Sequence, residues 1–253
     1  MNDEKKLADF QRKGFQINNF KANNAYYTLK KVLSEIKNDK IKNNYYLESK
    51  YLNTLDLRPD VNSYNSCFLD LLIENNIYEK INFLTQRKME LAHIQLRISK
   101  PGNSYMPWHK DTYSYTEKSS GLVPAPIKLI YYYPFCEKEK EETKLQILEG
   151  SHRCELNNLP IQYQISPGFN LFDKDVAMKN LKCVNFTNNE FQYLLFDTSC
   201  LHNVTSAEYE SVRVIYTFCT EYQFYKTFGS EKNKNKENHI KTFTDYRKRN
   251  EKS

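Results

Sequence analysis

The sequence has no closely spaced cysteines. Its six cysteines are scattered over 253 residues, and no two of them form a C-x-x-C pair. Zinc knuckles and small disulfide-stapled domains both depend on such spacings, so the sequence favours neither class. Cysteines spread in this way are typical of reduced thiols in a cytosolic protein.

Long apolar runs are missing as well. The first ten residues, MNDEKKLADF, are mostly charged or polar and contain no apolar core of a signal peptide. No stretch approaches the roughly 18 consecutive apolar residues that a membrane-spanning helix needs. We therefore expect a cytoplasmic protein that has no membrane partner.

Basic residues are not concentrated on the part of the chain that we expect to fold. The formal net charge is +6, and residues 230–253 carry eight Lys/Arg against four Asp/Glu. The rest of the chain is therefore close to neutral, so we expect no nucleic-acid partner. Residues 230–253 predict a polar, basic C-terminal tail that is solvated or disordered. Ile240, Phe243 and Tyr246 nevertheless have a spacing that would let one helical turn dock.

The length allows one large domain. A chain of 253 residues can bury roughly 70–75% of the surface that it exposes when unfolded. Apolar residues recur at three- and four-residue steps early in the chain, as at Leu29, Val32, Leu33 and Ile36, and this spacing predicts helices. We predict a single domain over residues 1–229, with helical support over about 1–87 and a β-rich core over about 91–229.

The residues beyond 91 are typical of a sheet. Short runs rich in β-branched and aromatic residues follow one another, namely AHIQLRIS, IKLIYYY, KLQILE, QYLLFDT and SVRVIYTFCTEY. Many short strands with irregular connections favour a sandwich or a jelly roll over a parallel sheet. Residues 150–190 contain Pro160, Pro167 and Gly168, so we expect them to be mostly loop, either a lid or an insertion.

A histidine and an aspartate stand two residues apart where a strand is expected to end. In WHKD, residues 108–111, one residue separates His109 from Asp111, and residues i and i+2 of a strand point to the same face. An imidazole and a carboxylate on one face are two potential metal ligands. The pair also fits a histidine and an aspartate that hydrogen-bond only to each other or to the backbone.

Three more histidines, His152, His202 and His239, follow this pair. His239 lies in the polar tail, where a buried ligand is not expected. His202 follows the strand QYLLFDT and precedes Arg213 by 11 residues, a spacing that lets the chain return as a neighbouring strand with its guanidinium inside a barrel. Two histidines and one carboxylate are the ligands of non-haem Fe(II) oxygenases, and such an arginine would pair with the distal carboxylate of 2-oxoglutarate. The alternative is a loop histidine and a surface arginine.

These segments together resemble a known family. WHKD, then LEGSHR at residues 148–153, then YLLFDTSCLHNVTSAEYESVRVIYTF at residues 193–218, look like successive signatures of the phytanoyl-CoA dioxygenase-like family of Fe(II)/2-oxoglutarate oxygenases. LADFQRKGFQINNF, residues 7–20, resembles the N-terminal stretch of that family, so the resemblance covers about residues 7–228. It implies a mainly β fold with N-terminal helices, whose core is a double-stranded β-helix, the cupin-like jelly roll, with iron at its open end.

The resemblance also implies roles for single residues. His109, Asp111 and His202 match the iron ligands and catalytic residues, Arg213 matches the arginine that binds the cosubstrate, and His152 is not a ligand in the family pattern. Val204 stands where the family has a small hydroxyl residue. This departure leaves Thr205 as the candidate for a second contact to 2-oxoglutarate, unless nothing replaces the hydroxyl.

The activity that the resemblance implies is a dioxygenase reaction with Fe(II), 2-oxoglutarate and O2. A small or medium organic substrate would be hydroxylated while 2-oxoglutarate is decarboxylated to succinate and CO2. The same oxygenase chemistry can instead end in desaturation, cyclisation or epimerisation. A jelly-roll binding module without catalysis is a third reading, which the intact triad and arginine speak against.

Overall fold

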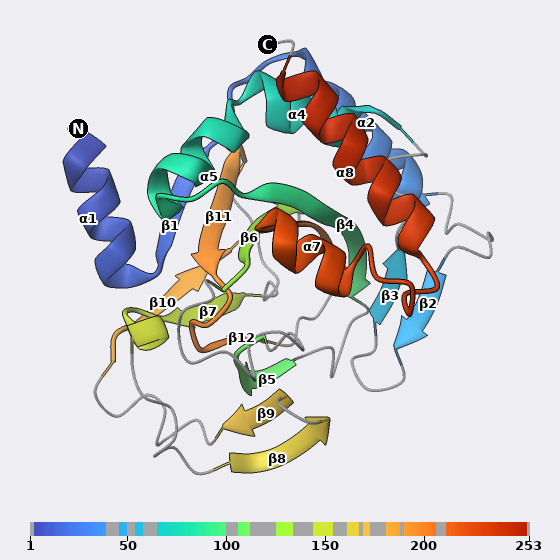
Figure 1. The fold of residues 1–253 in the computed structure, drawn as a ribbon. Helices are drawn as coiled ribbons and strands as arrows, with labels where there is room; N and C mark the ends of the chain where they lie inside the picture. The colour runs from blue at the N-terminus through green and yellow to red at the C-terminus, as the bar shows by residue number, and fades with distance from the viewer. Residues whose placement is uncertain are drawn as a thin grey trace.

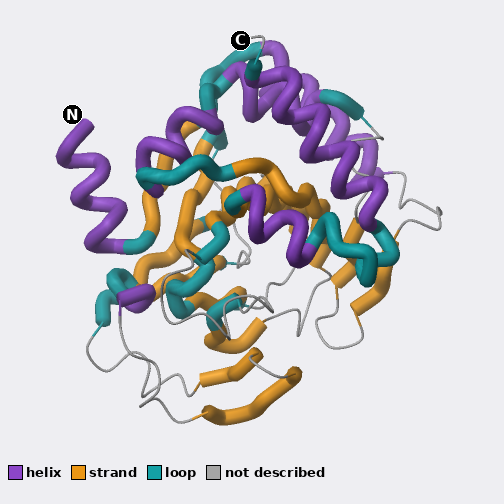
Figure 2. The backbone as a smooth tube through the Cα atoms, viewed as in Figure 1, coloured by secondary structure: helices purple, strands orange, loops and turns teal. Residues whose placement is uncertain are grey.

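The protein is a two-sheet structure with helices on its outside (Figures 1 and 2). The computed structural model describes residues 3–38, 46–49, 54–57, 65–99, 106–111, 125–133, 144–153, 161–166, 169–172, 181–187, 190–205 and 211–251. Among the helices in these ranges, none combines the length and the apolarity that crossing a bilayer requires.

The N-terminal part contains the predicted helices and also strands. The helices are α1 (Asp3–Lys13), α2 (Asn24–Asn38), α4 (Cys67–Glu74) and α5 (Ile77–Thr85). Between α1 and α2 runs β1 (Phe15–Asn19), and β2 (Tyr46–Ser49) and β3 (Thr54–Leu57) follow α2. All three strands pair within the larger sheet, so this part of the chain is more than a helical support.

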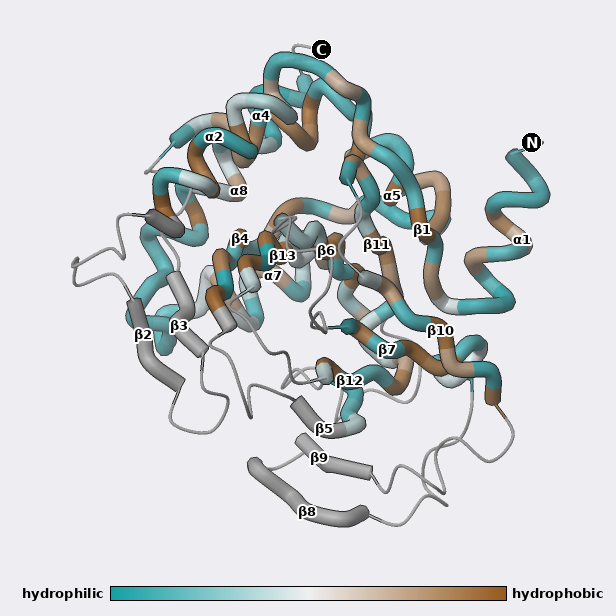
Figure 3. Tube along the Cα trace, turned by 180° about the vertical axis from the view of Figure 1, so that it is seen from behind, coloured by the Kyte–Doolittle hydropathy of each residue, from teal (hydrophilic) through white to brown (hydrophobic). Residues whose placement is uncertain are grey.

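The larger sheet has seven strands in the order β1-β11-β6-β13-β4-β3-β2. Its remaining members are β4 (Glu90–Ser99), β6 (Ile127–Tyr133), β11 (Gln192–Asp197) and β13 (Ser211–Cys219). These strands coincide with four of the predicted runs. Hydrophobic and hydrophilic residues alternate along them, whereas the outlying α1 is largely hydrophilic (Figure 3).

The smaller sheet has six strands in the order β10-β7-β12-β5-β9-β8. They are β5 (Met106–His109), β7 (Leu145–Leu148), β8 (Ile161–Ser166), β9 (Phe169–Phe172), β10 (Cys183–Phe186) and β12 (His202–Val204). Every strand pair in the described ranges is antiparallel. Two facing antiparallel sheets with this crossed order confirm the predicted jelly roll.

The two largest apolar cores lie on either side of the larger sheet. The larger core lies between the helices and the outer face of the larger sheet, where Leu29, Leu72 and Val214 are fully buried. The second core lies between the sheets, where Ile130 and Ile215 of the larger sheet share a cluster with residues of β7, β10 and β12. The inner faces of both sheets therefore form the wall of the candidate site.

The described parts of residues 150–190 are mostly strands, whereas we expected loop. They contain the short 3-10 helix η1 (Ser151–Arg153) and the strands β8, β9 and β10. The loop prediction rested on the prolines and the glycine of this segment, but prolines also occur at the ends of strands. Pro160, Pro167 and Gly168 lie outside the described residues.

The basic C-terminal segment is not a solvated tail. After α7 (Glu221–Thr227), residues Lys236–Asn250 form the helix α8, which buries His239, Thr242, Phe243 and Tyr246. Arg247 of α8 pairs with Glu90, at the start of β4, at 2.9 Å. The apolar residues whose helical spacing was noted in the sequence belong to a full helix, longer than the single turn that we considered. The expectation of a disordered tail was wrong because it rested on the polar composition of the segment.

Candidate metal centre

His109 and His202 face each other across two neighbouring strands of the smaller sheet. Strands β5 and β12 are antiparallel, and His202 is in register with His109. The imidazole centroids are 4.2 Å apart and the ring planes are inclined by 50°. Both side chains are almost fully buried, at 2% and 4% exposure. Two residues 93 positions apart in the sequence are thereby brought together by one strand pairing.

Asp111 completes the group just beyond the end of β5. Its backbone N–H donates to the carbonyl of Thr198 at 3.0 Å, and the Thr198 N–H and hydroxyl both donate to the carbonyl of Pro126. These bonds fix the backbone of Asp111 against the ends of β11 and β6. Its carboxylate Oδ1 lies 4.0 Å from Nε2 of His109, and Oδ2 lies 3.8 Å from Nε2 of His202.

The ring of His202 is held in one orientation. Nδ1 lies 2.9 Å from the carbonyl oxygen of Cys200, which can only accept, so Nδ1 carries the proton and Nε2 keeps a lone pair that faces Asp111. The ring also packs edge-on against Phe196, with centroids 4.9 Å apart. Burial lowers the pKa of His202, although Asp111 and the Cys200 carbonyl act in the opposite direction. A neutral imidazole is the form that binds metals.

A lysine from the opposite sheet holds the carboxylate. Nζ of Lys128, on β6, lies 2.7 Å from Oδ2 of Asp111. Burial alone would raise the pKa of Asp111, but the charge of Lys128 lowers it well below its usual value, followed by the two imidazoles, which are charged in the acid range where this carboxyl titrates. The carboxylate is therefore ionised at neutral pH and is ready to act as a ligand.

These three residues form a set that fits a transition metal. One ligand atom from each of His109, Asp111 and His202 lies within 4.8 Å of the others, and no other such group was found among the described residues. Two imidazole nitrogens and one carboxylate oxygen are the ligands of mononuclear non-haem iron. A metal-bound histidine usually donates its other ring N–H to a carboxylate, a backbone carbonyl or water. In His202 the backbone carbonyl of Cys200 takes this place.

The other two candidate histidines lie elsewhere. His152, in η1, has its Nε2 3.1 Å from the carbonyl oxygen of Gln11. His239, in α8, packs against His93 and Phe228 with centroid distances of 5.3 and 5.4 Å. Neither belongs to the group that could hold a metal.

Arg213 lies inside the jelly roll, but β13 belongs to the larger sheet and β12, which carries His202, to the smaller one. The expectation that the two strands are neighbours was therefore wrong. Arg213 is 3% exposed, and β13 places it opposite Arg97 of β4 and Tyr132 of β6. Its guanidinium carbon is 5.7 Å from the centroid of the Tyr132 ring. Burial raises the pKa of Tyr132, while the charge of Arg213 opposes this.

Thr205 lies one residue beyond β12 and points toward β7. Its hydroxyl oxygen accepts the N–H of Lys144 at 2.9 Å, and its own N–H donates to the carbonyl of Lys144 at 2.9 Å. Thr205 therefore extends the pairing of β12 with β7. Its predicted contact with 2-oxoglutarate stays a prediction.

The sequence did not identify two polar residues that point into the jelly roll from the larger sheet, Lys128 of β6 and Gln95 of β4. Nothing in the sequence shows that Lys128 meets a carboxylate 17 residues away. The alternation of β4 and β6 would have placed both side chains inside, had the register of the two strands been known.

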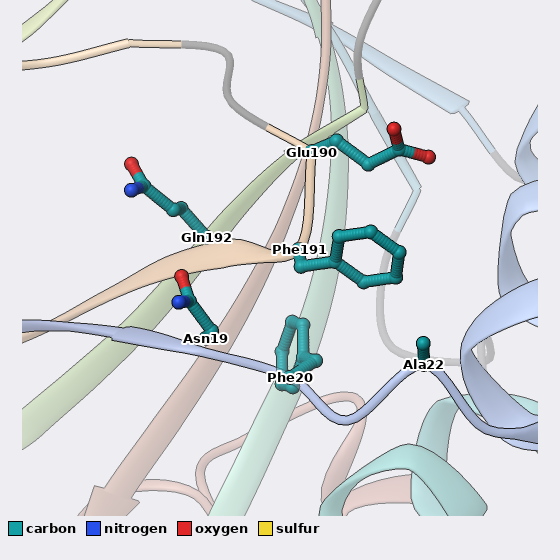
Figure 4. A pocket seen from close by; sticks show the side chains of 6 residues that line it. All are labelled: Asn19, Phe20, Ala22, Glu190, Phe191 and Gln192. Atoms are coloured by element: carbon teal, nitrogen blue, oxygen red, sulfur yellow. The ribbon is translucent and has the colours of Figure 1, made fainter.

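A surface hollow of about 480 Å³ lies at the other end of β11 from Thr198 (Figure 4). It is lined by Asn19, Phe20, Ala22, Glu190, Phe191 and Gln192. None of the candidate site residues lines it, so we do not connect it with the metal centre.

Comparisons with known proteins identify the fold. The sequence matches no family model and no curated protein. EctD from S. alaskensis, solved with 2-oxoglutarate and 5-hydroxyectoine, is 13% identical, with 87% of this chain and 76% of that chain covered and a TM-score of 0.63. The epimerase SnoN, in complex with Fe3+, alpha ketoglutarate and nogalamycin RO, is 9% identical, with 86% and 83% covered and a TM-score of 0.62.

A third similar structure is HygX from Streptomyces hygroscopicus, solved with nickel, 2-oxoglutarate and hygromycin B. It is 10% identical, with 86% of this chain and 87% of that chain covered and a TM-score of 0.58. Similarity at such identities shows a shared fold. Membership in the phytanoyl-CoA dioxygenase-like family in particular stays a prediction.

Proposed function

We propose that this chain is an Fe(II)/2-oxoglutarate-dependent dioxygenase that acts on a small-molecule substrate. The observation that carries the proposal is the convergence of two imidazole nitrogens and one carboxylate oxygen within 4.8 Å. Such a set leaves metal positions open for a chelating cosubstrate and for O2. The fold is one in which other proteins, EctD and SnoN, have been solved with 2-oxoglutarate.

The residues of this chain would bind and orient the reacting groups. When bound, Fe(II), 2-oxoglutarate and O2 supply the oxidising chemistry, and 2-oxoglutarate is converted to succinate and CO2. His202 offers Nε2 because Cys200 holds the proton on Nδ1. Asp111 offers an ionised carboxylate because Lys128 and the imidazoles lower its pKa, against the effect of burial. The apolar cluster between the sheets, which includes Phe196, keeps bulk water away from these groups.

Arg213 would bind the distal carboxylate of 2-oxoglutarate. Its planar fork of N–H donors matches a carboxylate, and the ring of Tyr132 supports the guanidinium at 5.7 Å. The position of Arg213 on the inner face of β13, 11 residues after His202, supports this role. Thr205 would be at most a minor contact, because its hydroxyl oxygen already accepts the N–H of Lys144.

Hydroxylation is the outcome that we propose for the substrate. Desaturation, cyclisation and epimerisation are alternatives from the same chemistry, and SnoN is described as an epimerase. A non-catalytic binding module is the third candidate, and the ionised Asp111 next to a neutral His202 speaks against it.

Metal binding by two histidine variants tests the proposal. His202→Ala should abolish binding of one equivalent of Fe(II) or Mn(II), measured by anaerobic calorimetry, because it removes one of three ligands. His152→Ala is the matched control and should bind like the parent, since this histidine lies outside the triad. The reverse result would remove the basis of the proposal. A screen of small organic compounds for substrate-dependent release of succinate by the iron-loaded parent would then identify the substrate class.

A further inference from the structure

Gln95 lies on the same inner face as Arg213. Gln95, on β4, is opposite Ile215 of β13, and Arg97 is opposite Arg213. Diagonal neighbours on one face of a sheet have Cβ atoms roughly 7–8 Å apart, within reach of long side chains. Ile215 belongs to the apolar cluster between the sheets, so Gln95 also points into the jelly roll. One small anion can therefore contact both the amide of Gln95 and the guanidinium of Arg213.

The amide nitrogen of Gln95 is buried and has no hydrogen-bond acceptor among the described residues. The residue is only 5% exposed. Buried amide donors nearly always have a partner, and a donor without one destabilises the fold. A leucine or methionine would avoid this cost, so the glutamine is explained if a bound ligand supplies the acceptor.

Two guanidinium groups beside this amide supply further donors. Arg97 and Arg213 have N–H donors and no acceptor. Tyr132 flanks Arg213 on the other side, on β6. A carboxylate, with about four lone-pair positions, is the acceptor that several converging donors can share.

Strand β12 does not direct a hydroxyl group to the space beside Gln95 and Arg213. Val204 has an apolar side chain, and the side chain of Thr205 is engaged with the backbone of Lys144. If Arg213 binds the distal carboxylate of 2-oxoglutarate, the remaining lone pairs of that carboxylate need a donor from another strand. Strand β4 offers one in Gln95.

We propose that Gln95 donates a hydrogen bond to the distal carboxylate of 2-oxoglutarate, which is thus held by the amide of Gln95 and the guanidinium of Arg213. This inference rests on the proposed function and makes it more specific. It makes Gln95 a determinant of selectivity for a dicarboxylic 2-oxo acid over 2-oxo acids that lack the second carboxylate.

The test compares two ligands on two proteins. Binding of 2-oxoglutarate and of 2-oxopentanoate, which has a methyl group in place of the distal carboxylate, is measured by calorimetry on the Mn(II)-loaded parent and on Gln95→Met. Because the variant loses a hydrogen bond to a charged group, we expect it to bind 2-oxoglutarate about 10- to 100-fold more weakly than the parent. Its affinity for 2-oxopentanoate should stay within about twofold of the parent value.

Folding of the variant can be checked independently. Gln95→Met removes a buried donor without an acceptor, so the ligand-free variant should melt at or above the parent temperature. Gln146→Met is the matched control, because Gln146 lies on the outward face of β7 and bonds to Asn185. It should bind both ligands like the parent. Gln95→Glu places a second carboxylate next to the distal carboxylate of 2-oxoglutarate. Because the two negative charges repel, this variant should weaken 2-oxoglutarate binding at least as much as Gln95→Met.

Two results would overturn the inference. Equal weakening of both ligands by Gln95→Met would mean that Gln95 acts on the fold or the metal. Unchanged binding of both ligands would mean that Gln95 does not contact the cosubstrate. Failure of the proposed function itself looks different: the parent would then bind no metal, or would not distinguish 2-oxoglutarate from 2-oxopentanoate.

Discussion

Replacing Lys128 with methionine tests what holds Asp111 in the metal-free protein. Nζ of Lys128 lies 2.7 Å from Oδ2 of Asp111, and the two side chains are 17% and 14% exposed. Methionine keeps much of the apolar stem and removes the ammonium. The carboxylate is then left next to two imidazoles, without a cation that donates to it, which is unfavourable in a largely buried place.

The size of the effect follows from the exposure of the pair. Removing one partner of a fully buried ion pair costs about 3–5 kcal/mol, and a hydrogen bond to a charged group contributes about 1.5–3 kcal/mol. Because both side chains keep some contact with solvent, we expect the variant to lose about 2–3 kcal/mol of unfolding free energy. For a domain of this length, the melting temperature should fall by about 4–12 °C.

The assay is urea unfolding at pH 7 with and without excess Mn(II). A divalent cation bound at the triad supplies the missing positive charge, so the difference between Lys128→Met and the parent should shrink when Mn(II) is present. By linkage, the variant should bind Mn(II) at least as tightly as the parent. Lys110→Met is the matched control, since Lys110 is half-buried and directly precedes Asp111. It should change stability little.

The difference should also depend on pH. In the parent, burial alone would raise the pKa of Asp111 above its ordinary value of 3.8, but Lys128 and the imidazoles lower it. The stability that the ionised group contributes is therefore present above pH 3.8 and is lost only as the pH falls through the lowered pKa. Without Lys128 the carboxyl takes up a proton at higher pH, so the difference should shrink in acid. An equal difference with and without Mn(II) would refute Lys128 as the counter-ion of a metal-binding carboxylate.

Three further predictions concern Arg213, α8 and Gly14. Arg213→Ala should raise the Michaelis constant for 2-oxoglutarate roughly 10- to 150-fold and leave Mn(II) affinity nearly unchanged; an unaltered constant would assign the carboxylate to another cation. A chain ending at residue 229 should unfold at lower urea, because it loses α8 and the partner of the buried Glu90; an unchanged midpoint would contradict this. Gly14→Ala would place a Cβ 2.4 Å from Cys200 Sγ at φ +80°, whereas Gly150→Ala, at φ +79°, meets nothing closer than 3.4 Å. Gly14→Ala should therefore cost about 1–3 kcal/mol more in urea unfolding than Gly150→Ala, and equal costs would refute the close packing at Gly14.

The local parts of the site could be predicted from the sequence. The H-x-D spacing predicted that His109 and Asp111 converge, and their ligand atoms do lie close together, although β5 ends at His109 and Asp111 follows it. The runs around them have strand composition. The spacing from His202 to Arg213 correctly allowed a returning strand, although that strand lies in the other sheet and is not a neighbour of β12. Each of these inferences uses residues that are close in sequence, where backbone geometry decides the outcome.

The remaining parts depend on strand register, which the sequence does not reveal. Lys128 meets Asp111 because β6 pairs with β11, so that Lys128 is opposite Phe196 near the end of that strand. Gln95 becomes a neighbour of Arg213 only through the pairing of β4 with β13. The docking of α8 depends in the same way on Glu90, more than 150 residues from Arg247. Composition indicated solvent for that segment, whereas tertiary contacts order it.

The contact between Cys200 and Gly14 bears on when the site can form during synthesis of the chain. The carbonyl of Cys200 orients His202, and its thiol lies 3.6 Å from the carbonyl oxygen of Gly14, which is 186 residues earlier. At about 5–20 residues per second on the ribosome, roughly 10–35 s separate the emergence of β1 from that of its partner β11. A nascent chain therefore presents the H-x-D pair long before His202 has a fixed orientation. Metal would be acquired by the finished fold, in contrast to a zinc finger, whose metal organises the chain around it.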